Sequence, residues 1–394
     1  MNLDEMLSQA MGRGASDVHL KPLAHPILRI HGYLELEQGW PEITHEYMLD
    51  QAKRLLKPGR LTALLEEGQE QDLAYTVKGA GRFRVNVFLA KGEIHGSFRA
   101  IPDKIPVFEE LNLPKVLEKL AMERRGMIIV TGVTGSGKTT TQAAMIDYMN
   151  RYRNDHIITI EDPIEFIHED KTCVISQREI GQDSPNFAQA LRAGLRQDPD
   201  VILVGEMRDP ETMSVALHAA ETGHLVLSTL HTLDAAETIN RLIASFPPHQ
   251  EDQIRAQLSG VMAGIISQRL VVKSGGKGRV PAAEVMLGTG LIRESIRDPE
   301  KTPQIPAIIA GGHGQYGMQT FDQSLLTLYR DDKISLETAL EAATNADDFA
   351  LKVRGIFSAA EMTWEVGTDD PGKPGGRPPG APAAGGTTFF RKEK

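Results

Sequence analysis

The stretch IIVTGVTGSGKTTT, Ile128–Thr141, runs from an apolar segment through a glycine-rich turn into a predicted helix. It satisfies the pattern G-x-x-x-x-G-K-[ST], with the predicted strand 127–130 before it and the predicted helix 139–152 after it. The glycines let the backbone curl so that several N–H groups point at phosphate oxygens, and the helix N-terminus adds positive potential. The sequence therefore predicts a site for a nucleoside triphosphate.

This loop also predicts how ATP and Mg²⁺ are held. We expect Lys138 to reach the β- and γ-phosphates and the Thr139 hydroxyl to ligate Mg²⁺. The residues expected to bind the nucleotide are Gly132, Thr134, Gly135, Ser136, Gly137, Lys138, Thr139 and Thr140.

Composition narrows the class of protein. The 394 residues suggest two domains, and the net charge of −10 argues against general nucleic-acid binding. The single cysteine excludes a disulfide framework and a cysteine-rich zinc site, and it fits a reducing cytoplasm. The start MNLDEMLSQAMGRGASD is unlike a secretory signal, and no apolar run reaches the ~20 residues that cross a bilayer. We therefore expect a cytoplasmic protein that meets the membrane only through a partner.

The chain divides into four predicted parts. Residues 1–100 mix short strands with amphipathic helices, and residues 101–114 form a linker with three prolines. In residues 115–356 short apolar strands alternate with longer helical patterns, which predicts an α/β domain with a mainly parallel sheet and a final amphipathic helical cap. Residues 357–394 are rich in Gly, Pro and Ala, so we expect a disordered tail.

Polar residues follow three further strands of the predicted sheet, at the edge where ligands bind in such folds. Glu161, Asp162 and Glu165 follow the strand HIITI, Glu206 follows VILV, and His231 follows LVLSTL. Hydrolysis needs one carboxylate to orient water and another near the metal. Spacing does not assign these two roles.

Individual residues at these strand ends differ in how well they suit a nucleotide site. Glu206 stands where a Walker B acid would, although Gly205 replaces the Asp of many such sites. His231 is placed to hydrogen-bond the γ-phosphate, whereas His224 lies at the opposite end of its strand and also fits a structural role.

Two arginines of the first domain are predicted to face each other. A hairpin that turns at Lys91-Gly92 sets apolar side chains on one face and pairs Arg84 with Arg99 on the other. Two guanidinium groups in this position destabilise the sheet unless an anion lies nearby or both side chains extend into water. Our hypothesis is that both arginines reach the γ-phosphate held by a neighbouring subunit. Such an arginine finger, supplied in trans, raises the rate of hydrolysis by ~10³–10⁵.

With these motifs, the chain resembles the PilT-type ATPases, the retraction motors of type IV pili within the secretion ATPase superfamily. The resemblance runs from ASDVHL (Ala15–Leu20) to DDFALKVRGI (Asp347–Ile356). The motifs that carry it are GVTGSGKTTT, TIEDPIEF, QDPDVILVGEMRD, ETGHLVLSTLHT and GMQTFDQSL.

The resemblance implies a PAS-like domain followed by a RecA-like ATPase domain, in a hexamer with sites between protomers. It implies that Glu165 is the water-activating base and Glu206 the Walker B carboxylate that helps to hold Mg²⁺. Glu161 and Asp162 then belong to the aspartate box, and His224 and His231 to the histidine box. Arg84 and Arg99 match the arginines that the family supplies from its first domain.

The resemblance also bears on pilus retraction and on binding partners. It implies an inner-membrane pilus platform protein as partner, peripheral association with that membrane, and a paralogous retraction ATPase as a further partner. In the segment TGLIRES, Leu291 replaces the Ala of an Ala-Ile-Arg motif that the family links to retraction, and the longer tail leaves the PilU-like branch open.

Three functions remain at this point. A motor ATPase that powers pilus retraction is favoured over a RecA-like ATPase that moves nucleic acid, because the chain is acidic. A nucleotide-gated scaffold of the pilus machinery is the third.

Overall fold

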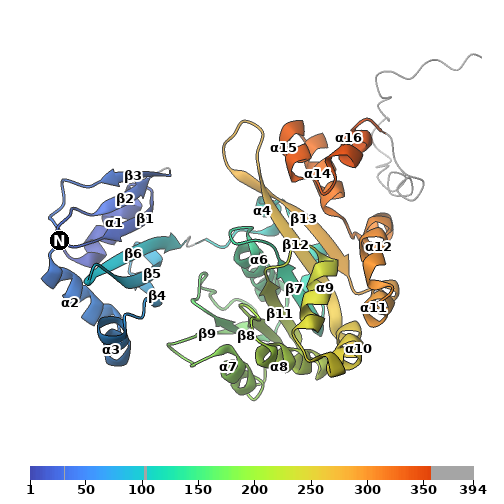
Figure 1. Ribbon diagram of the computed structural model, residues 1–394, viewed down its shortest axis with the longest axis horizontal. Coiled ribbons are helices and arrows are strands. Elements are labelled where there is room, and N and C mark those ends of the chain that lie inside the picture. The colour runs from blue at the N-terminus through green and yellow to red at the C-terminus, as the bar shows by residue number, and fades with distance from the viewer. Residues whose placement is uncertain (31, 102–103, 356–394) are drawn as a thin grey trace, which may run out of the picture.

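The structure is a computed structural model that describes residues 1–30, 32–101 and 104–355 (Figure 1). Two folded regions lie side by side, joined after the last strand of the first one (Figure 1). The tail predicted at 357–394 lies outside the described residues, and so does Pro102 of the predicted linker.

The first region is a six-stranded antiparallel sheet with three helices, which confirms the predicted α+β domain. The strand order is β3-β2-β1-β6-β5-β4. Its apolar face and the apolar stripes of the helices form one core that contains Leu3, Met48, Leu64 and Phe83. The elements are α1 (Leu3–Gly12), β1 (Ala15–Leu20), β2 (Ile27–Ile30), β3 (Tyr33–Leu36), α2 (His45–Leu55), α3 (Pro58–Glu67), β4 (Gln71–Val77), β5 (Gly81–Ala90) and β6 (Glu93–Ile101).

The β5–β6 hairpin has the predicted register. Arg84 is paired with Arg99, and the chain turns at Lys91 and Gly92, whose φ angles are 56° and 80°. Two consecutive residues with positive φ match the twist of the strands they join, as in a type I′ turn. The two arginines therefore share one face of the sheet.

The second region is a seven-stranded sheet with the order β13-β12-β7-β11-β10-β8-β9. All neighbouring pairs are parallel except β12 with β13, which form an antiparallel hairpin. The strands are β7 (Gly126–Thr131), β8 (His156–Glu161), β9 (Val174–Glu179), β10 (Val201–Val204), β11 (Leu225–Leu230), β12 (Met262–Val272) and β13 (Arg279–Leu287).

Helices cover both faces of this sheet, which explains why its central strands are buried throughout and mostly apolar. One core packs against α4, α5 and α6 and the other against α7 to α12, while α14 to α16 cover the β12–β13 hairpin as the predicted cap. The helices are α4 (Phe108–Leu111), α5 (Val116–Ala121), α6 (Lys138–Tyr152), α7 (Phe187–Gly194), α8 (Pro210–Glu221), α9 (Ala235–Ala244), α10 (Glu251–Val261), α11 (Gly290–Arg297), α12 (Ile305–Gly311), α13 (His313–Tyr316), α14 (Phe321–Arg330), α15 (Leu336–Ala342) and α16 (Ala346–Val353).

The predicted linker is shorter than residues 101–114. Phe108 and Leu113 are 5% and 8% exposed and pack in the same core as α6. Prolines marked this stretch as irregular, but its two large apolar residues anchor it to the second domain. That domain therefore begins before Phe108.

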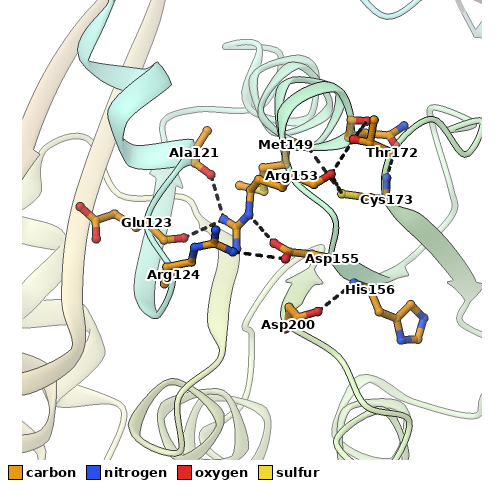
Figure 2. A network of polar contacts seen from close by, with 11 residues as sticks. Ala121, Glu123, Arg124, Met149, Arg153, Asp155, His156, Thr172, Cys173 and Asp200 are labelled. Carbon is orange, nitrogen blue, oxygen red and sulfur yellow. Dashed lines mark hydrogen bonds and ion pairs between the residues drawn. The ribbon is translucent and has the colours of Figure 1, made fainter.

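A buried polar network joins the segments at the amino ends of the parallel strands (Figure 2). The Arg153 guanidinium forms an ion pair with Asp155 and donates hydrogen bonds to the carbonyl oxygens of Ala121, at 3.0 Å, and Glu123, at 2.7 Å. Arg124 contacts the same carboxylate of Asp155 at 3.4 Å. The network fixes the ends of α5 and α6 against the start of β8, and so sets where α6 lies on the sheet.

Asp155→Ala should lower the free energy of unfolding by about 3–5 kcal/mol, because it leaves the buried Arg153 charge uncompensated. The Arg153 side chain is 1% exposed. Arg124→Ala is the control: its side chain is 75% exposed, so its loss should cost less than about 1 kcal/mol. Urea unfolding of both variants measures the difference, and equal losses would contradict this account of the network.

Candidate functional site

The phosphate loop joins β7 to α6 and can form only with glycine at its first position. Gly132 has a φ of 138°, and a Cβ there would lie 2.4 Å from the carbonyl oxygen of Gln268 and 2.6 Å from Ser136 Oγ. Such contacts are too close for any side chain. The loop therefore curls tightly against β12 and directs its backbone to the N-terminus of α6, the position that binds anions.

Lys138 is the first residue of α6, and its ammonium group lies inside the curl of the loop. Its Nζ donates to the carbonyl oxygens of Gly132, at 2.8 Å, and Val133, at 3.2 Å. Burial lowers the pKa of Lys138, while the negative charges of Glu206 and Glu165 raise it. The charge of Lys138 thus interacts with both carboxylates that the sequence singles out.

The other strand ends lie at the same edge of the sheet. The parallel register sets Val204 beside Ile160 and Ser228, and Leu230 beside Thr131, so Glu161, Glu206 and His231 follow their strands near the phosphate loop. Burial lowers the pKa of His231, the charge of Lys138 lowers it further, and Glu206 opposes both. His231 is therefore a neutral hydrogen-bonding group at neutral pH.

Glu206 follows β10 and is mostly shielded from water, with its side chain 16% exposed. Its Oε1 lies 2.7 Å from Nε of the exposed Arg208. At the preceding residue, Gly205, a Cβ would lie 3.3 Å from the carbonyl oxygen of Ile160, so the Asp found in many such sites would require the neighbouring strand to shift by a few tenths of an ångström. The close approach of β8 and β10 thus favours glycine at this position.

Glu161 anchors the loop that carries Glu165. Its Oε1 accepts hydrogen bonds from Thr159 Oγ1, at 2.7 Å, and Gln177 Nε2, at 3.3 Å. The same Gln177 amide donates to the carbonyl oxygen of Phe166 at 2.9 Å. Burial raises the pKa of Glu161 to about 7, against the lowering effect of its two hydrogen-bond donors.

An arginine of the first domain contacts the loop that carries Glu165. Arg84 Nη1 lies 3.6 Å from Glu165 Oε1 of the same chain, and Arg99 Nε lies 2.8 Å from Asp17 Oδ1. The two guanidinium groups are thus opposite each other in the sheet, as predicted, but each has its own carboxylate within the chain. An external anion is not needed to balance this pair.

Further contacts hold the first domain against the end of β9 and the segment that follows β8, and the sequence analysis did not predict them. Arg82 Nη2 lies 2.9 Å from the buried carboxylate of Glu179, and Arg82 Nε donates to the carbonyl oxygen of Ile164 at 3.1 Å. Lys57 Nζ donates to the carbonyl oxygen of Gln182 at 3.2 Å. The alternation that marked Arg84 also places Arg82 on the polar face, so the pattern carried a signal for it. Nothing in the sequence marked Glu179.

Asp162 also lies between the two domains. Burial raises its pKa, the negative charges of Glu206 and Asp72 raise it further, and Arg208 and Arg84 lower it. Asp72 and Arg84 belong to the first domain and the other two to the second. The segment that follows β8 is therefore the place where the charges of both domains meet.

His224 and Leu291 lie away from these groups. His224 precedes β11, so six strand residues, about 20 Å, separate it from His231. Its Nδ1 contacts the carbonyl oxygen of Ala219 at 2.9 Å, which suits a structural role in the turn after α8. Leu291 is 54% exposed on α11, where it lines a groove with Ile308, Tyr316 and Met318.

Thr139 and Glu206 are the two oxygen donors that the sequence analysis expects to ligate a metal ion at this edge. Among the residues that the structure describes, there is no group of three or more His, Cys, Asp or Glu side chains arranged to hold a metal. Mg²⁺ in nucleotide sites takes one or two protein oxygens together with phosphates and waters. The donor set therefore fits Mg²⁺ bound with a nucleotide and does not fit a permanent all-protein metal site.

Comparison with known proteins identifies the family. Residues 107–307 match the family described as Type II/IV secretion system protein. The chain is 43% identical to the type IV pilus retraction ATPase PilT of Pseudomonas aeruginosa, over 89% of this chain and 100% of that protein. It is 38% identical to the type IV pilus ATPase PilU of the same organism, over 94% of this chain and 98% of that protein.

The chain belongs to the PilT-type secretion ATPases. A solved structure of the pilus retraction motor PilT with bound ADP is 44% identical, has a TM-score of 0.81, and covers 88% of this chain and 98% of that one. The ATPase DotB of Legionella pneumophila is 28% identical, with a TM-score of 0.76, over 90% of this chain and 96% of that one. The PilT-type family confirms the predicted RecA-like fold, ATPase activity and nucleotide binding.

No helix in the described parts of this PilT-type chain is both long and apolar enough to cross a membrane.

Glu161→Gln should remove a pH-dependent loss of stability. The pKa of Glu161 rises from 4.5 in the unfolded chain to about 7 in the folded one. Its contribution to stability is therefore complete below pH 4.5 and is lost as pH rises to about 7 and beyond. The variant, which cannot ionise, should be more stable than the wild type at pH 8 and no more stable at pH 5 in thermal unfolding without nucleotide. A difference that does not change with pH would contradict the raised pKa.

Proposed function

We propose that this protein is an ATP-hydrolysing motor that forms a ring and powers the retraction of type IV pili. One observation carries the proposal: the phosphate loop, two carboxylates and a histidine meet at one sheet edge, beside an arginine of the first domain. The relatives that match nearly the whole chain are named as pilus retraction and twitching motility proteins.

Each group at this edge has a role that its chemistry suits. Glu165, the less buried carboxylate with its side chain 34% exposed, orients and deprotonates the attacking water. Lys138 and the loop N–H groups hold the β- and γ-phosphates, and neutral His231 hydrogen-bonds the γ-phosphate. Thr139 and Glu206 would hold Mg²⁺, which would neutralise negative charge on the phosphate oxygens.

Arg84 and Arg99 complete the site from the first domain. In a ring the first domain of one protomer lies next to the nucleotide domain of another, and we propose that its arginines contact the γ-phosphate there. The contact between Arg84 and Glu165 within one chain supports a second version, in which the arginines act on their own protomer's site. Both versions connect hydrolysis to the position of the first domain, which is what a motor needs.

Partners and location follow from the same proposal. The protein would act at the cytoplasmic side of the inner membrane through a pilus platform protein, and it would work with a paralogous ATPase of its own family. Leu291 would act on retraction rather than on hydrolysis, because it lies away from the nucleotide edge, and His224 would keep its structural role in the turn after α8. A role in moving nucleic acid is less well supported, because the chain has a net charge of −10.

Purified protein should hydrolyse ATP, and Lys138→Ala should abolish hydrolysis because it removes the charge that holds the phosphates. Single- and double-stranded DNA should leave the rate unchanged. A rate that rises with DNA and falls steeply with salt would favour the nucleic-acid translocase instead. Binding of ATP with negligible turnover would favour the scaffold.

Mixing two inactive variants separates the two versions of the arginine role. Arg84→Ala/Arg99→Ala should lower kcat by ~10³–10⁵ with little change in nucleotide affinity, because the arginines act mainly on the transition state. If the arginines act in trans, mixed rings of this variant and Lys138→Ala regain activity. The active sites are those where the intact loop of the arginine variant meets the intact arginines of a neighbouring Lys138→Ala protomer.

The control for this experiment is Arg54→Ala, which removes an arginine that pairs with Asp4 within the first domain. It should keep wild-type turnover. No recovery on mixing would show that the arginines serve their own protomer. Full activity of the double arginine variant alone would contradict both versions.

A further inference from the structure

A row of buried polar side chains crosses three neighbouring strands below the phosphate loop. Ser267 on β12 is paired with Thr131 on β7 and with Glu284 on β13. Paired residues of adjacent strands point to the same face, so the three side chains are neighbours. Thr131 and Ser267 are 0% exposed and Glu284 is 6% exposed. Burying polar groups in this way costs free energy of folding unless the groups form hydrogen bonds.

One end of the row is part of the phosphate loop. Thr131 directly precedes Gly132, whose Cα faces Ser136 and the backbone of Gln268. A shift of Thr131 therefore moves the start of the loop.

The other end of the row holds the segment that carries His231. Glu284 Oε1 accepts a hydrogen bond from the backbone N–H of Ala235, the first residue of α9, at 2.8 Å. Thr238 of α9 lies 2.7 Å, Oγ1 to Oγ1, from Thr232, the residue next to His231. The position of α9 therefore sets the position of His231.

The middle of the row has unused hydrogen-bonding capacity. Within the described residues, neither Thr131 Oγ1 nor Ser267 Oγ has a hydrogen-bond partner. A hydroxyl can both donate and accept, and it rotates to suit its neighbours. These two hydroxyls can therefore follow a change at either end of the row.

The charge state of Glu284 depends on groups from each element that surrounds it. Burial raises its pKa to about 7, and the carboxylates of Asp234 on the α9 side and Asp322 on α14 raise it. The Ala235 N–H and the guanidinium of Arg269 on β12 lower it. Both the protonated and the ionised form are thus accessible near neutral pH.

We propose that Glu284 is a positioning residue of the ATPase site, which links the segment carrying His231 to the phosphate loop through Ser267 and Thr131. The inference rests on the proposed ATPase function of the same site. Glu284 does not touch the nucleotide in this scheme. It acts by fixing α9 at one end of the polar row, so that occupancy of the phosphate loop and the position of His231 change together.

The test is a double-mutant cycle on the full-length protein, with kcat, KM and ATP affinity measured for each variant. Glu284→Leu keeps the volume and removes both oxygens, so kcat should fall about 10- to 100-fold while ATP affinity is unchanged. Ser267→Ala should lower kcat as well, and the double variant should be no slower than Glu284→Leu, because both changes break one linkage. Additive effects on kcat would overturn the proposal.

Asp147→Asn is the control. Asp147 is also a buried carboxylate of the second domain, paired with Arg151 and Lys171, but it lies outside the row and is not among the charges that shift the pKa of Glu284. The variant should change stability without changing kcat. A fall in kcat equal to that of Glu284→Leu would show that loss of any buried carboxylate in this domain slows hydrolysis, and would overturn the specific role of Glu284.

Glu284→Gln provides a second readout that does not depend on how well the leucine variant folds. The amide resembles the protonated acid, so kcat of the variant and of the wild type should agree well below pH 7 and diverge above it. A ratio of the two kcat values that stays constant across this range would overturn the proposal. Absence of ATP hydrolysis by the wild type would instead refute the proposed function itself.

Discussion

The site depends on parallel backbone pairing in the centre of the second sheet. β11 lies between β7 and β10, and β10 lies between β11 and β8, all in parallel register. Because parallel strands end at the same edge, residues from four distant parts of the chain meet there. A slip of one residue in any pair would turn buried side chains toward the wrong face and move a catalytic group away. These strands are fully buried and rich in Val, Ile and Leu, which prevents such slips.

The parts of the molecule that were predicted from the sequence are those with a local signal. Gly132 and Lys138 lie in a spacing that only a phosphate loop requires, and the alternation around Arg84 determined the hairpin register. Glu206 and His231 could be placed because they directly follow apolar strands. For each of these the relevant neighbours lie within a few residues in the sequence.

The parts that were missed depend on residues far apart in the chain. Asp17 pairs with Arg99, and Glu179 pairs with Arg82, across separations that no periodicity reports. The antiparallel β12–β13 hairpin, which carries Glu284, broke the alternation of strand and helix on which the prediction relied. The linker was drawn too long because prolines are visible in a sequence, whereas the burial of Phe108 is not.

Charge connects the two domains at the segment that follows β8 and at the end of β9. Arg84 of the first domain faces Glu165, the candidate base, and Arg82 binds Glu179 at the end of the neighbouring strand β9. A γ-phosphate at the same edge would compete with Glu165 for the guanidinium groups, since a phosphate is the more highly charged partner. Binding and hydrolysis of ATP would then alter how firmly a first domain is held, and a ring of such contacts could convert hydrolysis into movement.

The most direct measurement is a structure of the assembled protein with Mg²⁺ and a non-hydrolysable ATP analogue. The account predicts that Arg84 and Arg99 of a neighbouring protomer lie within hydrogen-bond distance of the γ-phosphate, with Glu165 beside the attacking water. A γ-phosphate contacted only by groups of its own nucleotide domain, with both arginines turned away, would contradict it.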